Sequence, residues 1–486
     1  MTPRAALVVA GLALTAIAVG AGCAGISLPT RKGEKAPVIV DVKRGPYARS
    51  SLAVGEEKDL ARQRSERFGF VRQARVEQYL NEVRAKLLVV SGVTGVPGRV
   101  TIAAAPDLEA YSTPDGNVYV SMGCLEELES ADEVAAVLAH ELAHVLLGHH
   151  DADIFADVQH RGRALYELWI DAKTKANGKP KPSKGDAKGL DSAETVTRVT
   201  DKLLLPAWSR GQEREADLLG IDLLLEAGYA PTAMISVLEK LRAQERTDQE
   251  ANQAFLDRLR DGSNRSIKQL GNEVWKEALG RISGGHPKAE ERIQETAQYL
   301  ERHYGQRTLA EPKTGPWKVL RSQAEVREVM AHYRLAFNAH RSLEKGQTQE
   351  AYDSARKAVV GRTAGDAYPN VVLARSAEAL GRQPEAFGAL RRALGSKEPV
   401  AMVYTELIAM NERTGNIPAA LDWTAKASET FADSPRWQPE RIRLLHKAGR
   451  PADAQAATIE CGVKTPDWKY LCERANKLGA AARATR

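Results

Sequence analysis

The segment His140-Glu141-Leu142-Ala143-His144 decides how this sequence is interpreted. In an α-helix, residues four positions apart lie on one face, so the two imidazoles come together with the Glu141 carboxylate beside them. Imidazole nitrogens bind Zn²⁺ at about 2.0–2.1 Å, and an open coordination position lowers the pKa of a bound water to about 7. The segment therefore predicts one Zn²⁺ per chain, with His140 and His144 as ligands and Glu141 as the general base.

The residues around this segment predict that a helix carries it. Ser130-Ala131-Asp132-Glu133 has the spacing of a capping box, and the helical pattern continues to Gly148. A separate face for packing is offered by apolar side chains, namely Leu138, Leu142, Val145 and Leu146. This context favours the metal site over the alternative, two histidines on a purely structural helix.

A third protein ligand must come from elsewhere, and two candidates compete: His150 and a carboxylate on a later helix. A third histidine this close in sequence needs a glycine three residues after His144, where the chain can turn sharply. That position holds Leu147, and Gly148 comes one residue late. The carboxylate is therefore favoured, and His149 and His150 are expected to form the polar end of the helix.

Carboxylates stand close together in Ser209-Arg210-Gly211-Gln212-Glu213-Arg214-Glu215-Ala216-Asp217, at the start of an apolar-periodic segment. Glu213 and Asp217 share a helical face. One of them can bind zinc while the other accepts the second N–H of a ligand histidine and fixes its tautomer. A solvated helix face is the alternative, and the flanking alanine and leucine residues disfavour it. The residues alone do not decide which of the two acids is the ligand.

Three motifs follow one another in this chain: HExxH, then SRxxExEAD, then His286-Pro287 with Glu291-Arg292-Ile293. This order resembles the zinc metallopeptidase family that contains the heat-shock protease HtpX and the type 1 CAAX prenyl protease. In layout the chain is most similar to the periplasmic BepA-like branch, which carries tetratricopeptide repeats. The resemblance implies a gluzincin-type zinc peptidase domain that is mainly α (α+β), with a small β-sheet.

The resemblance also implies roles for individual residues. It makes Glu213 the zinc ligand and Asp217 the supporting acid. It implies that His286 lies beside the metal, where it stabilises the oxyanion or occupies the open zinc position in a resting state. It makes 117–121 similar to an edge strand that receives substrate backbone by β-augmentation. The chain departs from the family pattern at Glu109-Ala110, where Asn-Ala is common, and at Cys124, where leucine is expected.

The N-terminus predicts export. An uncharged apolar run from Ala5 to Gly22 follows Arg4, and small residues precede Cys23. This resembles the lipobox of bacterial lipoproteins, although Gly20 stands where leucine is usual. We expect a signal peptide over 1–23 and a periplasmic protein attached to the outer membrane through a lipid on Cys23, with a plain signal peptide or an uncleaved anchor as alternatives.

Export leads to an oxidising compartment, where cysteines can pair. Cys461 and Cys472 are close enough in sequence to form a disulfide. The alternative, two small buried residues on adjacent helices, is equally ordinary. Cys124 is expected to be reduced in the core.

Composition shifts divide the rest of the chain. Residues 24–50 are predicted to be a tether, 51–305 the zinc metallopeptidase domain, and 306–325 a linker. Strands are expected at Arg99–Ala104 and at Asn117–Ser121. Within the domain, residues 173–189 contain six lysines and almost no apolar side chains, which is typical of a flexible basic loop.

A repeat appears in residues 326–486. Gly346, Gly381, Gly415 and Gly449 stand 35, 34 and 34 residues apart, and an alanine follows each glycine after five residues. Twelve residues after each glycine comes another small residue: Ala358, Ala393, Ala427 or Cys461. A glycine between helices and small residues where helices cross are typical of tetratricopeptide repeats. We therefore expect an α-solenoid of tetratricopeptide-like repeats that binds protein or peptide, with a purely structural extension as the alternative.

The functional expectation combines these observations. The formal charge of +6 is small for 486 residues and gives nucleic-acid binding little support. The resemblance implies a zinc-dependent endopeptidase of the bacterial cell envelope that acts on misfolded or stalled outer-membrane proteins. It also implies that the repeats recruit these substrates and contact the outer-membrane assembly machinery. The alternative is a periplasmic chaperone or assembly adaptor with a latent metal site. A prenyl-protein protease is excluded because the chain lacks the many membrane spans that it would need.

Overall fold

A computed structural model describes residues 36–66, 69–151, 208–246, 289–396, 398–432 and 434–484 of the chain. Three features expected from the sequence lie outside these residues: the signal peptide with Cys23, the basic loop 173–189, and His286. All elements below belong to the unit Pro37–Arg486.

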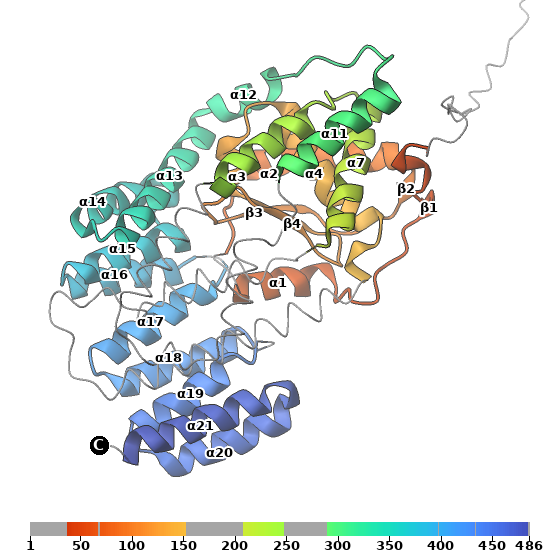
Figure 1. Ribbon diagram of the computed structural model, residues 1–486. Helices are drawn as coiled ribbons and strands as arrows, with labels where there is room; N and C mark the ends of the chain where they lie inside the picture. The colour runs from red at the N-terminus through yellow and green to blue at the C-terminus, as the bar shows by residue number, and fades with distance from the viewer. Residues whose placement is uncertain are drawn as a thin grey trace, which may run out of the picture. The chain divides into compact units, whose positions relative to one another are not determined.

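In its described residues, the first part of this unit combines helices with two small sheets, which confirms the mainly helical α+β prediction (Figure 1). Its α-helices are α1 (Glu56–Glu66), α2 (Ala74–Ser91), α3 (Met122–Glu127), α4 (Ala131–Leu146), α7 (Arg210–Glu226), α11 (Ala289–Tyr304) and α12 (Gly315–Ser322). Its strands are β1 (Gly45–Pro46), β2 (Val93–Thr94), β3 (Val100–Ala103), β4 (Ala110–Ser112) and β5 (Val118–Ser121). The described residues of this part also contain two 3₁₀ turns, η1 (Val38–Val40) and η2 (His149–Asp151). None of the described helices is both long enough and apolar enough to span a bilayer.

The larger sheet has the order β3-β5-β4, so β5 is its central strand. β5 runs parallel to β3 on one side and antiparallel to β4 on the other. The expectation that 117–121 is a substrate-binding edge strand is therefore wrong. The reason is the tight turn at Thr113–Gly116, which folds Ala110–Ser112 back onto β5. Three residues are too few to show the alternation that predicts a strand, so β4 was not expected.

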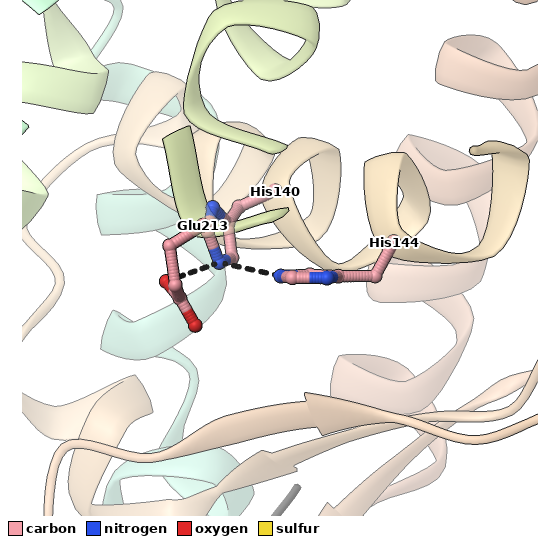
Figure 2. A group of neighbouring side chains, drawn as sticks. All are labelled: His140, His144 and Glu213. Carbon is pink, nitrogen blue, oxygen red and sulfur yellow. Dashed lines mark hydrogen bonds and ion pairs between the residues drawn. The ribbon is translucent and has the colours of Figure 1, made fainter. Parts of the chain in front are cut away.

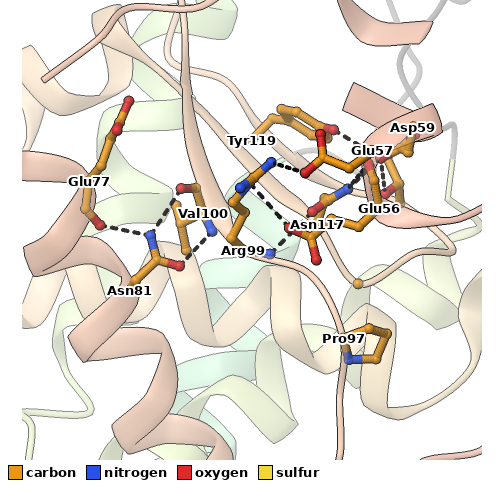
Figure 3. A network of polar contacts seen from close by, with 12 residues as sticks. Glu56, Glu57, Asp59, Glu77, Asn81, Pro97, Arg99, Val100, Asn117 and Tyr119 are labelled. Atoms are coloured by element: carbon orange, nitrogen blue, oxygen red, sulfur yellow. Dashed lines mark hydrogen bonds and ion pairs between the residues drawn. The ribbon is translucent and has the colours of Figure 1, made fainter. Parts of the chain in front are cut away.

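Buried polar contacts tie α1 and α2 to this sheet (Figure 3). Asp59 of α1 is fully buried and accepts hydrogen bonds from Asn117 Nδ2 and from the Tyr119 hydroxyl, both at 2.9 Å. Asn81 of α2 pairs with both backbone groups of Val100, since its Oδ1 accepts from the Val100 N–H at 2.9 Å and its Nδ2 donates to the carbonyl at 3.1 Å. These contacts fix the strands relative to the helices.

The helices α4 and α7 start at side-chain caps and pack against each other (Figure 1). Ser130 Oγ accepts from the Glu133 N–H at 3.0 Å, so the predicted start of α4 is confirmed. Ser209 and Gln212 form a capping box at the start of α7. At Gly220, a Cβ would lie 2.5 Å from the Met234 side chain and 3.4 Å from the backbone nitrogen of His140. The missing side chain lets α7 approach α4 closely at the HExxH segment.

Two segments differ from the tether and linker expected for them. In the predicted tether, the backbone N–H of Ile39 donates to Asp222 Oδ2 at 2.9 Å, and Gly45–Pro46 pairs with Val93–Thr94. In the predicted linker, α12 buries Trp317, whose Nε1–H donates to the Leu128 carbonyl at 2.8 Å. Both segments are therefore packed against the domain where these contacts occur.

A row of helices follows α12. Its members are α13 (Ala324–Glu344), α14 (Thr348–Ala358), α15 (Ala367–Ala379), α16 (Gln383–Leu394), α17 (Ala401–Arg413), α18 (Ile417–Thr430), α19 (Trp437–Lys447), α20 (Pro451–Lys464) and α21 (Lys469–Ala484). The four repeat glycines Gly346, Gly381, Gly415 and Gly449 each lie between two helices with φ of 74°, 75°, 80° and 75°. A Cβ at these positions would meet nothing within 4 Å, so the left-handed backbone, not lack of space, selects glycine.

The small residues of the repeat are buried between these helices. The alanines at the fifth position, Ala351, Ala386, Ala420 and Ala454, are all fully buried. Cys461 on α20 and Cys472 on α21 form a disulfide, which decides between the two alternatives for this pair. Cys124 is a buried free thiol, as predicted.

Candidate metal centre

Packing of α7 on α4 brings three of the predicted residues together (Figure 2). His140 and His144 project from α4, one turn apart, and Glu213 enters from the first turn of α7. The two Nε2 atoms lie 3.2 Å apart, and His140 Nε2 lies 3.6 Å from Glu213 Oε2. One ligand atom from each residue lies within 4.8 Å of the others.

These distances fit a single zinc ion. Tetrahedral ligands bound at about 2.0–2.1 Å lie about 3.3–3.4 Å from one another. Two imidazoles and one carboxylate are also a donor set of catalytic zinc sites, which keep a fourth position open. Burial lowers the pKa of His144 well below its ordinary value, so this imidazole is neutral at pH 7 and its nitrogen can bind a metal. The residues present therefore fit the metal that the sequence predicts.

Asp217 lies behind His140, one turn beyond Glu213 on α7. Its Oδ1 is 2.9 Å from His140 Nδ1, so it can accept the second N–H of this imidazole and orient Nε2 toward Glu213. Burial by itself would raise the pKa of Asp217, but the adjacent Arg292 guanidinium outweighs that effect and keeps the pKa below its ordinary value. Asp217 is therefore a buried carboxylate.

Arg292 of α11 joins the two acids. Its Nε and Nη2 each donate to Asp217 at 2.7 Å, and its Nη1 lies 2.9 Å from Glu213 Oε2. Sequence reasoning gave this residue no role, although it stands in the Glu291-Arg292-Ile293 motif. The motif pointed to this residue, but it did not show that α11 packs against α7.

His149 and His150 were predicted to form the polar end of the helix, but they lie beyond α4 in the separate 3₁₀ turn η2, and both are buried. His149 Nδ1 lies 2.9 Å from His144 Nδ1, and its Nε2 lies 3.2 Å from Glu215 Oε2. His150 packs edge-on against Trp208, and burial lowers its pKa to about 4. Within the described residues, Glu213 and not His150 completes the ligand group.

Trp208 was not expected at the site. Its ring stacks on the imidazole of His144 with centroids 4.2 Å apart, and the residue is buried. It stands directly before the helix cap Ser209, so the start of α7 places it. The stacked indole limits how the His144 ring can rotate.

A cavity of about 140 Å³ opens beside the ligand group. Glu141 lines it together with His140 and Glu213, so the predicted general base and two predicted ligands face one space. Residues 109–111 line it as well, which brings β4 to the cavity. Its apolar wall is formed by Cys124, Val137, Met234, Val237, Leu238 and Leu241.

Two helix-borne histidines, a carboxylate from a second helix and a glutamate facing a cavity are the arrangement of residues that zinc-dependent hydrolases use. Comparison with known proteins makes this assignment more specific, because residues 72–300 match the family model Peptidase family M48. This match confirms the resemblance seen in the motifs, since the similar proteins are also metallopeptidases.

Several proteases are similar to part of this chain. The beta-barrel assembly-enhancing protease of Escherichia coli (strain K12) is 24% identical over 249 residues, which cover 48% of this chain and 50% of the relative. The mitochondrial metalloendopeptidase OMA1 of Schizosaccharomyces pombe is 25% identical over 250 residues, covering 51% and 60%. The metalloprotease LoiP of Escherichia coli is 28% identical over 151 residues, covering 31% and 54%. The chain thus spans about half the length of these relatives.

Proposed function

We propose that this protein is a zinc-dependent endopeptidase in which His140, His144 and Glu213 hold one Zn²⁺ and Glu141 is the general base. The observation that carries the proposal is the ligand group on α4 and α7, placed beside a cavity that Glu141 lines. The match of residues 72–300 to a peptidase family supports the reaction class, hydrolysis of peptide bonds.

The chain's own side chains supply the remaining chemistry. When bound, zinc contributes Lewis acidity, which makes a water acidic enough to attack a peptide carbonyl at neutral pH. Glu141 takes the proton from the attacking water and delivers it to the departing amine. Asp217 keeps the proton of His140 on Nδ1, so that Nε2 stays available. His286 is proposed to stabilise the developing oxyanion or to occupy the open position in a resting state.

The substrate backbone is proposed to bind along β4. Among the described strands, β4 has a neighbour on one side, β5, and residues 109–111 line the cavity. An extended peptide added to this strand would form main-chain hydrogen bonds that do not depend on its sequence. Such binding suits an enzyme that acts on unfolded polypeptides of many sequences.

The biological setting is proposed to be the bacterial cell envelope. A relative is named for enhancing β-barrel assembly, which suggests misfolded or stalled outer-membrane proteins as substrates. The helices α13–α21, with glycine turns at four repeat positions, are proposed to be tetratricopeptide-like repeats that recruit these substrates or the assembly machinery. A lipid on Cys23 is proposed to attach the protein to the outer membrane.

Digestion of casein by the purified protein tests the proposed activity. Cleavage should stop when a chelator removes the metal and should return when Zn²⁺ is added in slight excess. A chelator-treated sample that is refilled with Mg²⁺ is the matched control and should stay inactive, because Mg²⁺ prefers oxygen ligands in octahedral geometry. Cleavage that continues unchanged after metal removal would reject the proposal.

A chaperone or assembly adaptor is the second candidate, and the long helical row α13–α21 favours it. The two candidates differ in their need for Glu141. In cells that lack the wild-type protein, Glu141→Gln should fail to restore outer-membrane assembly if the function is enzymatic. Full restoration by Glu141→Gln would support the adaptor.

A further inference from the structure

His149 has a place at the metal centre that the proposed mechanism does not use. It is nearly fully buried, and the chain reverses just before it at Gly148, which has φ of 68°. This turn brings His149, three residues beyond the end of α4, back to the helix, where its Nδ1 lies 2.9 Å from His144 Nδ1. Its other nitrogen, Nε2, lies 3.2 Å from Glu215 Oε2 on α7.

The three side chains admit one consistent set of protons when a metal is bound. In the ligand group the Nε2 atoms of His140 and His144 face each other at 3.2 Å, so Nε2 is the metal-binding atom. The single proton of neutral His144 must then sit on Nδ1 and point at His149 Nδ1. His149 Nδ1 accepts it, which requires the proton of His149 to be on Nε2, where Glu215 accepts it.

This series of hydrogen bonds behind His144 mirrors the series behind the other ligand, His140. His140 donates to Asp217, which Arg292 holds, whereas His144 donates to His149, which Glu215 holds. A metal-binding histidine whose second nitrogen has a fixed acceptor keeps its tautomer and ring orientation. Asp217 does this for one ligand only, so the second ligand needs its own acceptor.

The backbone of His149 is held as well. Gln212, which closes the capping box of α7, also donates from Nε2 to the His149 carbonyl at 3.3 Å. The first turns of α7 therefore supply Gln212 and Glu215 to His149, Glu213 to the ligand group, and Asp217 to His140. The segment 209–217 supports both ligand histidines.

We infer that His149 is a positioning residue for the metal ligand His144, acting as the acceptor for the Nδ1–H of His144 and held in the required tautomer by Glu215. The inference rests on the proposed metal site and deepens it. It assigns to the third histidine of the segment 140–150 a role in metal affinity without direct contact with the metal.

Zinc affinity of the full chain, measured by competition with a chromophoric chelator, tests the inference without any activity readout. His149→Phe keeps a ring of similar size but has no acceptor, and His149→Asn restores an acceptor oxygen. We expect His149→Phe to bind Zn²⁺ about 10–100-fold more weakly than the wild type, as for other partners of ligand histidines. His149→Asn should recover most of that loss.

His340→Phe is the matched control, because His340 lies in α13, where its Nδ1 is 2.9 Å from the Tyr368 hydroxyl. It should bind zinc as the wild type does. The absorption spectrum of Co²⁺-loaded protein gives a second readout, and its visible bands should change in His149→Phe and return toward wild type in His149→Asn.

The outcomes are separable. Equal zinc affinity in the wild type and His149→Phe would overturn the inference, and so would an equal loss in His149→Phe and His149→Asn, since packing rather than an acceptor would then matter. A wild-type protein that binds no zinc would overturn the proposed metal site and this inference with it.

Discussion

The guanidinium of Arg292 and the carboxylate of Asp217, 75 residues apart in sequence, are joined by two parallel hydrogen bonds of 2.7 Å. Such a fork binds more strongly than a single contact and fixes both planes. Because Asp217 in turn meets His140 at 2.9 Å, α11 controls the orientation of a metal ligand on α4. The metal centre is therefore built from three helices, although the ligands come from two.

Arg292→Lys separates the geometry of this contact from its charge. Lysine keeps the positive charge but cannot donate two parallel hydrogen bonds, so it is not a conservative replacement here. We expect zinc affinity to fall by about 10–100-fold, measured by chelator competition. Arg214→Lys, at an exposed position on α7 that pairs with Glu295 at 3.4 Å, should leave the affinity unchanged. Wild-type affinity in Arg292→Lys would mean that the fork does not support the ligands.

Glu141→Gln should separate zinc binding from catalysis. The amide has nearly the same shape, but it cannot take the proton of the attacking water. We expect casein cleavage to fall by about 10²–10⁴-fold while zinc affinity stays at the wild-type value. The rate of release of acid-soluble peptides and the bound zinc are measured on the same samples. A variant with wild-type cleavage would show that another group is the base.

Asp222 predicts an unusual dependence of stability on pH. Burial raises its pKa to about 6, from 3.8, even though the hydroxyls of Tyr299 and Tyr304 donate to it. A raised folded-state pKa stabilises the protein below pH 4, and this contribution is lost as the pH rises through about 6. The free energy of unfolding should thus fall by about 3 kcal/mol between pH 4 and pH 7 through this group.

Urea denaturation of the wild type and Asp222→Asn over this pH range tests that expectation. The asparagine does not titrate, so the difference between the two proteins should shrink or reverse as the pH rises. Asp453→Asn, at an exposed position, is the control and should follow the wild type. A constant difference between Asp222→Asn and the wild type from pH 4 to pH 7 would contradict the assignment.

Gly415 tests the role of the repeat glycines. Its φ is 80°, and a Cβ would meet nothing within 4 Å, so Gly415→Ala should lose about 1–2 kcal/mol of unfolding free energy from the backbone alone. Gly365→Ala is the matched control, because that position is equally open and its φ lies outside the left-handed region. It should be neutral or slightly stabilising. Equal effects of the two substitutions would remove the backbone explanation.

Sequence patterns predicted the parts of the site that depend on local structure. Helical spacing placed His140 and His144 on one face, and the capping pattern at Ser130 located the start of α4. Gly148 was predicted as the end of the helical pattern, but the turn there, which brings His149 to His144, was not predicted.

What could not be predicted depends on how distant segments meet. The order β3-β5-β4 follows from a tight turn and a three-residue strand, which leave no periodic pattern. The roles of Arg292 and Trp208 require knowing that α11 returns to α7 and that the segment before α7 lies against α4. Such contacts are set by packing across the domain, which a single sequence does not display.

The central claim is that one zinc ion is held between α4 and α7, and the zinc content of Glu213→Ala tests it most directly. The wild type and the control Glu226→Ala, altered at the exposed far end of α7, should each retain one zinc per chain after dialysis against a weak chelator. Glu213→Ala should lose its zinc under the same conditions. Full zinc content in Glu213→Ala would contradict the account.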